Sequence, residues 1–334
     1  MTNRLDTRLA LTSLADASEE IEAMRSGLLL AVAYGDVFDY AMRVEEIQRY
    51  LVGVRAGIRA VKQLLWEEAK QAKRLSQQDG LVCLAGREAL FEIRRERQAM
   101  AEKHWQAARA YGRILAGLPF ARMVAVTGSL AVDNLEADGD IDYLVVTAPG
   151  RVWLCRAMAI LVVRWAAQRG HRLCPNYFIS QDKLASEPED LYNAHELAQM
   201  VPLNNLELYK RMRASNPWTQ RYLPNAQSAP RHTLAKDTKR WEGQAQRLAE
   251  AGLSGRLGGG LENWEMKRKI ARFERQQAAR DLETNFCAEQ CKGHFEGHAE
   301  WTMAEFAKRV KRLRIPADTS SQPAHLEVHR GYDD

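Results

Sequence analysis

Residues 123–147 constrain the fold more than any other stretch of the 334-residue sequence. An apolar run ends at Gly128-Ser129, and ten residues later Asp140-Ile141-Asp142 leads directly into a second apolar run. Because side chains alternate across a strand, Asp140 and Asp142 should face the same side. Two adjacent carboxylates repel each other unless a cation lies between them. The pattern predicts two strands joined by a turn, a short helix and a loop, with an acidic pair beginning the second strand.

This arrangement suits the chemistry of phosphate transfer. Gly128 lets the backbone approach a phosphate closely, and Ser129 offers a hydroxyl and an N–H at a helix start, a position that favours anions. Mg²⁺ binds carboxylate oxygens and usually keeps phosphate oxygens as further ligands. The simpler alternative is a glycine turn before a solvated acidic loop, since Asp133, Glu136 and Asp138 make the loop acidic in any case.

The spacing of Gly128-Ser129 and Asp140-Ile141-Asp142 between two apolar strands resembles the signature of the DNA polymerase beta-like nucleotidyltransferase superfamily. The resemblance covers about residues 120–180 and implies an α/β (α+β) core with a small mixed sheet. It implies that Asp140 and Asp142 hold Mg²⁺ or Mn²⁺, while Gly128 and Ser129 hold the phosphates of a nucleoside triphosphate. The superfamily usually adds a third carboxylate on a later strand; the matching position here is Asn176, an uncharged catalytic-site ligand.

The resemblance implies transfer of a nucleoside monophosphate to an acceptor hydroxyl. A small alcohol, an aminoglycoside-like sugar, a protein side chain and an RNA end all remain open as acceptors. The charge missing at Asn176 could come from one of four nearby acidic residues: Asp182, Glu189, Asp190 or Glu196. The alternative function is a catalytically degenerate nucleotide sensor or a nucleic-acid-binding regulator.

Composition favours a soluble cytoplasmic protein. The net charge of +5 is compatible with nucleotide or nucleic-acid partners. Five scattered cysteines and no secretory signal predict reduced thiols in the cytoplasm. The apolar run 152–167 carries Arg156 and Arg164 and is short for a membrane span, so it predicts a buried helix and no membrane partner.

The N-terminal third predicts a polar tail over residues 1–20 and a winged-helix-like domain over 21–88. Helices are expected at 21–33, 44–51 and 57–68, before a hairpin turning at Asp79-Gly80. Such a domain can place its third helix in a DNA groove, with Arg59, Lys62 and Gln63 exposed. Glu67 and Glu68 would oppose phosphate there, which favours a structural or partner-binding role.

The remaining sequence predicts a connecting helix (89–120), the catalytic core (121–185), a helical extension (186–225), a linker (226–260) and a helical C-terminal region with a loose tail (261–334). In the connecting helix, Arg94, Arg95 and Arg97 either face a polyanion or pair with neighbouring glutamates. In the extension, Trp218 and Tyr222 either stack a base or pack in the core. His195 is expected to be a packed or capping residue more often than a catalytic one. The linker is expected to contain one helix at 238–251, and a final helix is expected at 301–313.

A second metal site is a weaker hypothesis. Cys287, Cys291, His294 and His298 have the spacing C-x3-C-x2-H-x3-H, and on one helix they would share a face. Thiolate and imidazole groups suit Zn²⁺. The spacing is more compact than in the usual zinc finger, and Gly293 and Gly297 interrupt a helix. Lys292 and His294 could instead contact phosphate.

Overall fold

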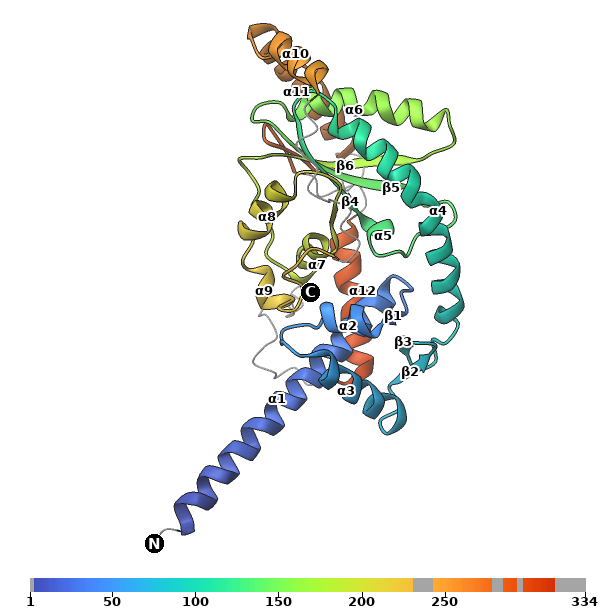
Figure 1. Ribbon diagram of the computed structural model, residues 1–334, viewed down its shortest axis with the longest axis vertical. Coiled ribbons are helices and arrows are strands. Elements are labelled where there is room, and N and C mark those ends of the chain that lie inside the picture. Colours follow the sequence, from blue (N-terminus) through green and yellow to red (C-terminus); the bar gives the residue numbers. More distant parts are fainter. Residues whose placement is uncertain (1–2, 231–242, 278–284, 293–296, 316–334) are drawn as a thin grey trace, which may run out of the picture.

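The structure is a computed structural model that describes residues 3–230, 243–277, 285–292 and 297–315. It is a mixed α/β fold with two sheets (Figure 1). A three-stranded antiparallel sheet belongs to the N-terminal third, and a six-stranded mixed sheet organises the rest. Among the described residues, no helix is both long enough and apolar enough to cross a membrane.

The N-terminal third contains three helices and three short strands. These are α1 (Asn3–Val37), β1 (Met42–Arg43), α2 (Val44–Arg49), α3 (Ile58–Lys70), β2 (Leu75–Gln78) and β3 (Leu81–Leu84). The strands pair in the order β1-β3-β2. Asp79 and Gly80 form the predicted two-residue turn, both with positive φ, as a tight hairpin requires. The element order is the one expected of a winged-helix-like region.

The expectation of a tail over residues 1–20 is wrong, because α1 begins at Asn3. Residues 3–26 contain neither glycine nor proline and are rich in Leu, Ala, Glu and Arg. These residue types favour a helix without help from tertiary contacts. The outer part of α1 projects from the body of the molecule (Figure 1).

The central part of the chain supplies the main strands and the helices that cover them. In chain order these are α4 (Leu90–Ala116), β4 (Ala121–Thr127), α5 (Gly128–Ala131), β5 (Ile141–Thr147), α6 (Val152–Ala167) and β6 (Leu173–Ser180). β4 pairs antiparallel with β5, and β5 pairs parallel with β6 across the α6 crossover. The predicted order of connecting helix, strand, short helix and second strand around Gly128 is therefore confirmed.

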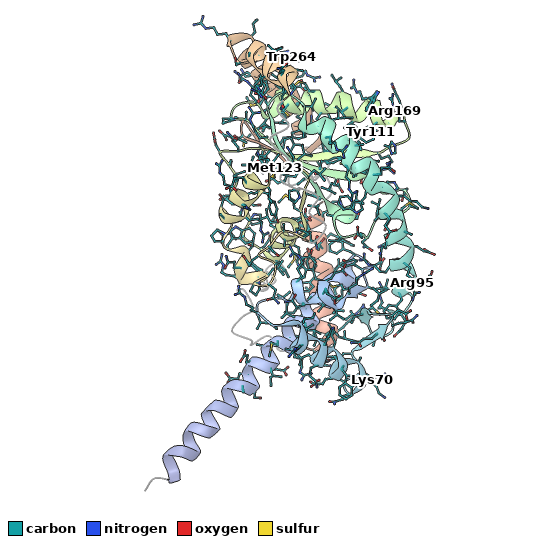
Figure 2. All side chains as sticks on the ribbon, viewed as in Figure 1. Lys70, Arg95, Tyr111, Met123, Arg169 and Trp264 are labelled. Carbon is teal, nitrogen blue, oxygen red and sulfur yellow. The ribbon has the colours of Figure 1, made fainter. Side chains whose placement is uncertain are left out.

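The six-stranded sheet is covered on both faces, as its alternating apolar residues require. Val124 and Val126 pack with α4 and α6, whereas Met123 and Ala125 pack with helices on the opposite face. Met123 lies inside the body in Figure 2, and Trp264 lies at one end of it. The second face shares one continuous hydrophobic core with α1, α2 and α3. Most of the N-terminal third is therefore packed against the sheet, and a small separate cluster lies under its hairpin: Ala41, Leu81, Cys83, Leu90 and Phe91.

The extension after β6 contributes a strand as well as helices. It contains α7 (Leu191–Gln199), β7 (Val201–Pro202), α8 (Leu206–Ala214) and α9 (Thr219–Tyr222). β7 pairs with β4 at one edge of the sheet. Trp218 and Tyr222 are buried and pack edge to face. They are core residues and do not offer a surface for stacking a base.

The helix expected at 238–251 is present in part as α10 (Gln244–Leu253), whereas the predicted linker at 226–260 is wrong at its glycine-rich end. Helix α11 spans Arg256–Gln277 and includes Gly258–Gly260. Tertiary contacts hold both helices. On α10, the side-chain amide of Gln246 donates to the Leu118 carbonyl and Glu250 accepts from Arg122, while α11 packs on α6, which overrides the low helix propensity of its glycines. At Gly258 an added Cβ would lie 1.6 Å from the Leu253 carbonyl oxygen, so α10 and α11 approach too closely for a side chain.

The C-terminal region packs against both the six-stranded sheet and the N-terminal third. It contains β8 (Asn285–Cys287), β9 (Gln290–Lys292) and α12 (His298–Leu313). β9 pairs antiparallel with β6, and the sheet order is β7-β4-β5-β6-β9-β8. Helix α12 packs along α1. The final helix predicted at 301–313 is confirmed.

Candidate functional site

The turn between β4 and α5 forms one side of the candidate site. Gly128 has φ +66°, a conformation that disfavours residues with a Cβ. A Cβ added there would lie 2.4 Å from Oδ2 of Asp142, closer than real Cβ contacts allow. The sequence therefore needs glycine here for two reasons, the backbone conformation and the approach of a carboxylate.

Asp142 faces this turn because Thr127 and Asp142 are direct partners in the β4–β5 ladder. Asp140 lies two residues earlier, immediately before β5, and lines the same cavity. Burial, together with the negative charges of Asp140 and Glu196, raises the pKa of Asp142 to about 8. The site thus disfavours a second negative charge unless a cation is bound.

Strand β6 completes the acidic group with two residues, Cys174 and Asn176. Asn176 donates from Nδ2 to Oδ1 of Asp142 over 3.0 Å, so the predicted residue does lie in the site. Cys174 is the parallel-strand partner of Asp142 and lies within hydrogen-bonding reach of both carboxylates. Burial and the two negative charges raise the pKa of the Cys174 thiol to about 12. The sequence analysis missed Cys174, although it occupies the same strand face as Asn176.

These residues line a cavity of about 550 Å³, a size typical of small-molecule sites. Its other walls come from distant parts of the sequence: α1, β1, α2, α7 and α12. The aromatic wall includes Tyr34, Phe38, Tyr50 and Tyr192. The winged-helix-like region and the last described helix therefore both help to enclose the space in front of the aspartates.

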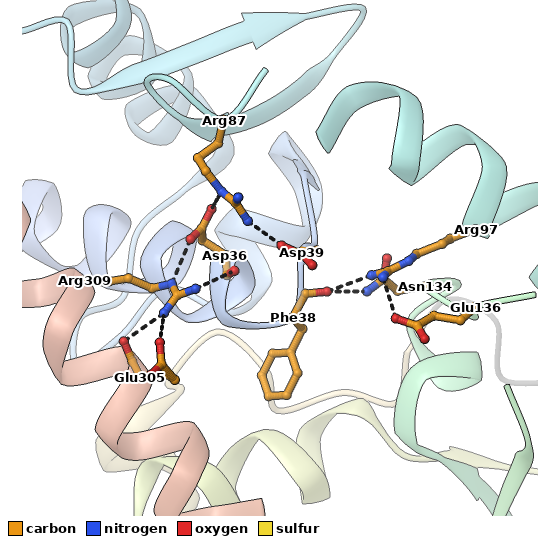
Figure 3. A network of polar contacts seen from close by, with 9 residues as sticks. All are labelled: Asp36, Phe38, Asp39, Arg87, Arg97, Asn134, Glu136, Glu305 and Arg309. Atoms are coloured by element: carbon orange, nitrogen blue, oxygen red, sulfur yellow. Dashed lines mark hydrogen bonds and ion pairs between the residues drawn. The ribbon is translucent and has the colours of Figure 1, made fainter. Parts of the chain in front are cut away.

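A polar network holds this wall in place (Figure 3). The Phe38 carbonyl accepts from Nδ2 of Asn134 over 3.0 Å and from Arg97 over 2.9 Å. Asp36 accepts from Arg87 over 2.9 Å and from Arg309 of α12 over 2.7 Å. The end of α1 is thereby fastened to α4, to the loop after α5 and to α12.

The cavity is acidic. Asp140, Asp142 and Glu196 line it, and the described lining residues include no lysine or arginine. Of the four carboxylates expected to compensate for Asn176, only Glu196 is among these lining residues. Asp190 caps α7 by accepting from the backbone N–H of Asn193, and Glu189 pairs with Arg221.

Three polar side chains in the cavity wall have atoms that lack a hydrogen-bond partner within the described part of the chain. These atoms are Oδ1 of Asn134, Nε2 of His195 and Oγ1 of Thr302, and each atom is buried. Buried polar atoms are rarely left unpaired, and ligands or ordered water often account for the exceptions. This observation supports a ligand-binding role for the cavity.

His195 is a packed residue, as the sequence favoured. It is 2% exposed, and its ring stacks on Tyr34 with centroids 3.8 Å apart. Burial lowers its pKa to about 3, so the ring is neutral at physiological pH. Its role is to support the aromatic wall.

The predicted basic cluster on α4 is occupied by structural contacts. The Arg94 guanidinium is buried; it donates to the Val132 and Asp133 carbonyls and pairs with Glu46. Arg95 pairs with Asp79 and Glu92, and Arg97 pairs with Glu136. Of these pairs, only Arg95–Glu92 is the expected pairing with a neighbouring glutamate; Arg94 and Arg97 instead connect α4 to acids distant in sequence.

The expectation that Cys287, Cys291, His294 and His298 share a helix is wrong for its first half. Cys287 and Cys291 lie on the β8–β9 hairpin, because the free edge of β6 pairs with β9. His298 lies at the start of α12 and lines the cavity, and His294 is outside the described residues. In the described part of the chain, the one group of metal-ligand type whose atoms lie within 4.8 Å of one another is Asp140, Asp142 and Cys174.

Comparisons of the chain with protein-family models, with curated proteins and with solved structures find no match.

Proposed function

We propose that this chain is a metal-dependent nucleotidyltransferase that moves a nucleoside monophosphate from a nucleoside triphosphate to an acceptor hydroxyl. The observation that carries the proposal is the position of the Gly128 turn directly against Asp142, at the mouth of a cavity that also contains Asp140 and Asn176. The motif that resembles the polymerase beta-like superfamily is thus folded into one site. Because Asp140 and Asp142 line this cavity, we favour the site over the simpler alternative of a solvated acidic loop.

A divalent cation fits these residues. Asp140 and Asp142 offer carboxylate oxygens close together, and burial together with the nearby negative charges raises the pKa of Asp142, so a bound cation would relieve their repulsion. Such a cation would neutralise phosphate charge and lower the pKa of an attacking hydroxyl. Because no lysine or arginine is found among the described lining residues, the cation is the main positive charge available to a triphosphate here.

Three further residues of the site have distinct roles in the proposed reaction. Gly128 leaves room for the Asp142 carboxylate beside the backbone, and Ser129 offers its hydroxyl and N–H to a phosphate oxygen. Asn176 fixes the orientation of the Asp142 carboxylate through its 3.0 Å hydrogen bond.

The test is pyrophosphate release from each of the four ribonucleoside triphosphates with Mg²⁺ or Mn²⁺, in the parent and in Asp140→Ala/Asp142→Ala. The cation supplies several kcal/mol of transition-state stabilisation, so we expect the variant to lose about 100-fold or more in rate. Asp182→Ala, which alters a carboxylate outside the cavity lining, is the matched control. Release that continues at the parental rate in the double variant would refute the site assignment.

A second candidate function, nucleic-acid binding through α3, is favoured by one observation. Arg59, Lys62 and Gln63 are exposed on α3, while the two opposing acids are already paired. Glu67 pairs with Arg25 over 2.8 Å, and Glu68 is buried between Arg25 and Arg74. The objection that these acids repel phosphate is therefore weakened.

Duplex binding that weakens with salt, survives Asp140→Ala/Asp142→Ala and is lost in Arg59→Ala/Lys62→Ala would support this second function. Equal binding by the parent and by the α3 variant would exclude α3 as the contact surface.

A further inference from the structure

Cys174 lies beside the two aspartates of the acidic pair. Its Sγ and one oxygen from each of Asp140 and Asp142 lie within 4.8 Å of one another. Cys174 faces Asp142 across the parallel β5–β6 ladder, so the backbone of two central strands fixes the arrangement. Asn176 donates from its Nδ2 to Asp142, and its amide oxygen brings no negative charge to the site, so in the described part of the chain a third anionic ligand would have to be Cys174.

The donor set of two carboxylates and one thiol differs from an all-oxygen magnesium site. Mg²⁺ prefers oxygen ligands in octahedral geometry, whereas a thiolate favours softer ions such as Zn²⁺. Catalytic zinc sites commonly have three protein ligands and one position open to water or substrate. Asp140, Asp142 and Cys174 supply three such ligands at the wall of an open cavity.

A second observation in the same cavity points to a ligand. Asn134 is 4% exposed and lines the same cavity, and its Oδ1 has no hydrogen-bond partner within the described residues. Its Nδ2 is held by the Phe38 carbonyl, which leaves the oxygen as the free end. A buried amide oxygen without a donor is costly unless a ligand or water satisfies it.

We propose that Cys174 is a metal ligand and that the site takes a thiophilic divalent cation of the zinc class, through Asp140, Asp142 and the Cys174 thiolate. Binding breaks the Sγ–H bond, the proton passes to the buffer, and no electron is transferred. The inference deepens the proposed function, since this cation would be the one that nucleotidyl transfer uses. It can be tested without any nucleotide.

The test uses Co²⁺ as a spectroscopic substitute for Zn²⁺, added to the full-length protein. We expect a thiolate-to-cobalt charge-transfer band in the near ultraviolet in the parent and in Cys287→Ser, a second partly exposed cysteine. We expect no such band in Cys174→Ser, and a Zn²⁺ affinity reduced by about 10–100-fold or more. Mg²⁺ affinity should be the same in the parent and in Cys174→Ser.

Asp142→Asn shows whether bound Co²⁺ occupies this site, because it removes a carboxylate ligand without touching the thiol. Cobalt that binds the parent, is lost in Asp142→Asn and gives no thiolate band would overturn the proposal in favour of an all-oxygen site. A thiolate band that persists in Cys174→Ser would overturn it as well, since another cysteine would then be the ligand.

The outcome is separable from that of the proposed function. A thiolate band without release of pyrophosphate from any triphosphate would leave the metal site standing and remove the transferase. The opposite result is also possible to distinguish: if the parent gives no thiolate band and Cys174→Ser releases pyrophosphate with Mg²⁺ at the parental rate, the transferase stands and the thiolate site is refuted.

Discussion

Gly128 is the residue at which the backbone limits what the site can hold. We expect Gly128→Ala to reduce nucleotide-dependent pyrophosphate release by about 10–100-fold, since its new Cβ would press on Oδ2 of Asp142. Because alanine is strained at positive φ, the substitution should also lower the free energy of unfolding by about 1–2 kcal/mol. Steady-state rates and thermal unfolding measure the two effects separately.

Gly150 gives a matched control for this substitution. It also has positive φ, at +61°, but an added Cβ there meets nothing within 4 Å. Gly150→Ala should therefore cost a similar free energy of unfolding and leave the rate unchanged. Equal loss of activity in both variants would mean that backbone strain alone, and not the contact with Asp142, explains the effect.

Asp142 makes stability depend on pH in the metal-free protein. Its pKa is raised to about 8, first by burial and then by Asp140 and Glu196, whereas an unfolded aspartate has a pKa of about 3.9. Between these values the folded state holds a proton that the unfolded state has released. The free energy of unfolding therefore falls as pH rises from about 4 to about 8 and then levels off.

Asp142→Asn cannot ionise, so we expect it to unfold at a higher temperature than the parent at about pH 8 and to lose that advantage toward about pH 4. Thermal unfolding across this range is the measurement, with Asp182→Asn as the control. Metal that binds the ionised carboxylates should stabilise the parent but not Asp142→Asn. A constant difference between the two proteins at every pH would contradict the assignment.

Among individual site residues, the sequence predicted those whose positions follow from the local pattern of strand and turn. Gly128, Ser129, Asp140 and Asp142 could be predicted because strand alternation and a turn place them together in local sequence. Asn176 required the superfamily resemblance, and Cys174 was missed because the expected ligand was a carboxylate. The signal was present nonetheless, since residues 174 and 176 share a strand face.

At the scale of elements, α6 begins without a capping side chain of its own. The carboxylate of Glu262, on α11, accepts from the backbone N–H groups of Trp153 at 2.8 Å and Leu154 at 2.7 Å. A carboxylate at a helix start satisfies otherwise unpaired N–H groups and opposes the positive end of the helix dipole. We expect Glu262→Ala to lower the free energy of unfolding by about 1–2 kcal/mol, measured by urea denaturation.

Glu262→Gln retains one oxygen acceptor and should lose less stability than Glu262→Ala. A similar loss in both would show that the negative charge, and not the hydrogen bond alone, stabilises the helix start. No loss in either variant would mean that α11 contributes nothing through this contact.

Elements formed by local pattern were predicted, and elements formed by distant pairing were not. The hairpin at Asp79-Gly80 follows from the two turn residues. In contrast, β7 and the β8–β9 hairpin exist because free edges of β4 and β6 accept them. Gly258–Gly260 is helical because α11 packs on α6, a contact between segments about one hundred residues apart that periodicity does not reveal.

At the scale of the whole molecule, the first and last described helices close the site together. Asp36, near the end of α1, is 5% exposed and accepts from Arg87 after β3 and from Arg309 on α12. Helix α12 also supplies His298 and Thr302 to the cavity wall. Loss of the Asp36 contacts should therefore affect both stability and ligand binding (Figure 3).

We expect Asp36→Ala to lower the free energy of unfolding by about 1–3 kcal/mol, because it removes the buried carboxylate that accepts from both Arg87 and Arg309 and leaves each with its outer acidic partner alone. Asp39→Ala removes a carboxylate that is 47% exposed and pairs with Arg87, so it should cost less than about 1 kcal/mol. In a double-mutant cycle, Asp36→Ala and Arg309→Ala should be less than additive by about 1 kcal/mol or more. Additive losses would show that the α1–α12 contact is not coupled through Asp36. If the cycle shows coupling, triphosphate binding should weaken in Asp36→Ala and remain at the parental level in Asp39→Ala, because Asp36 alone of the two reaches α12.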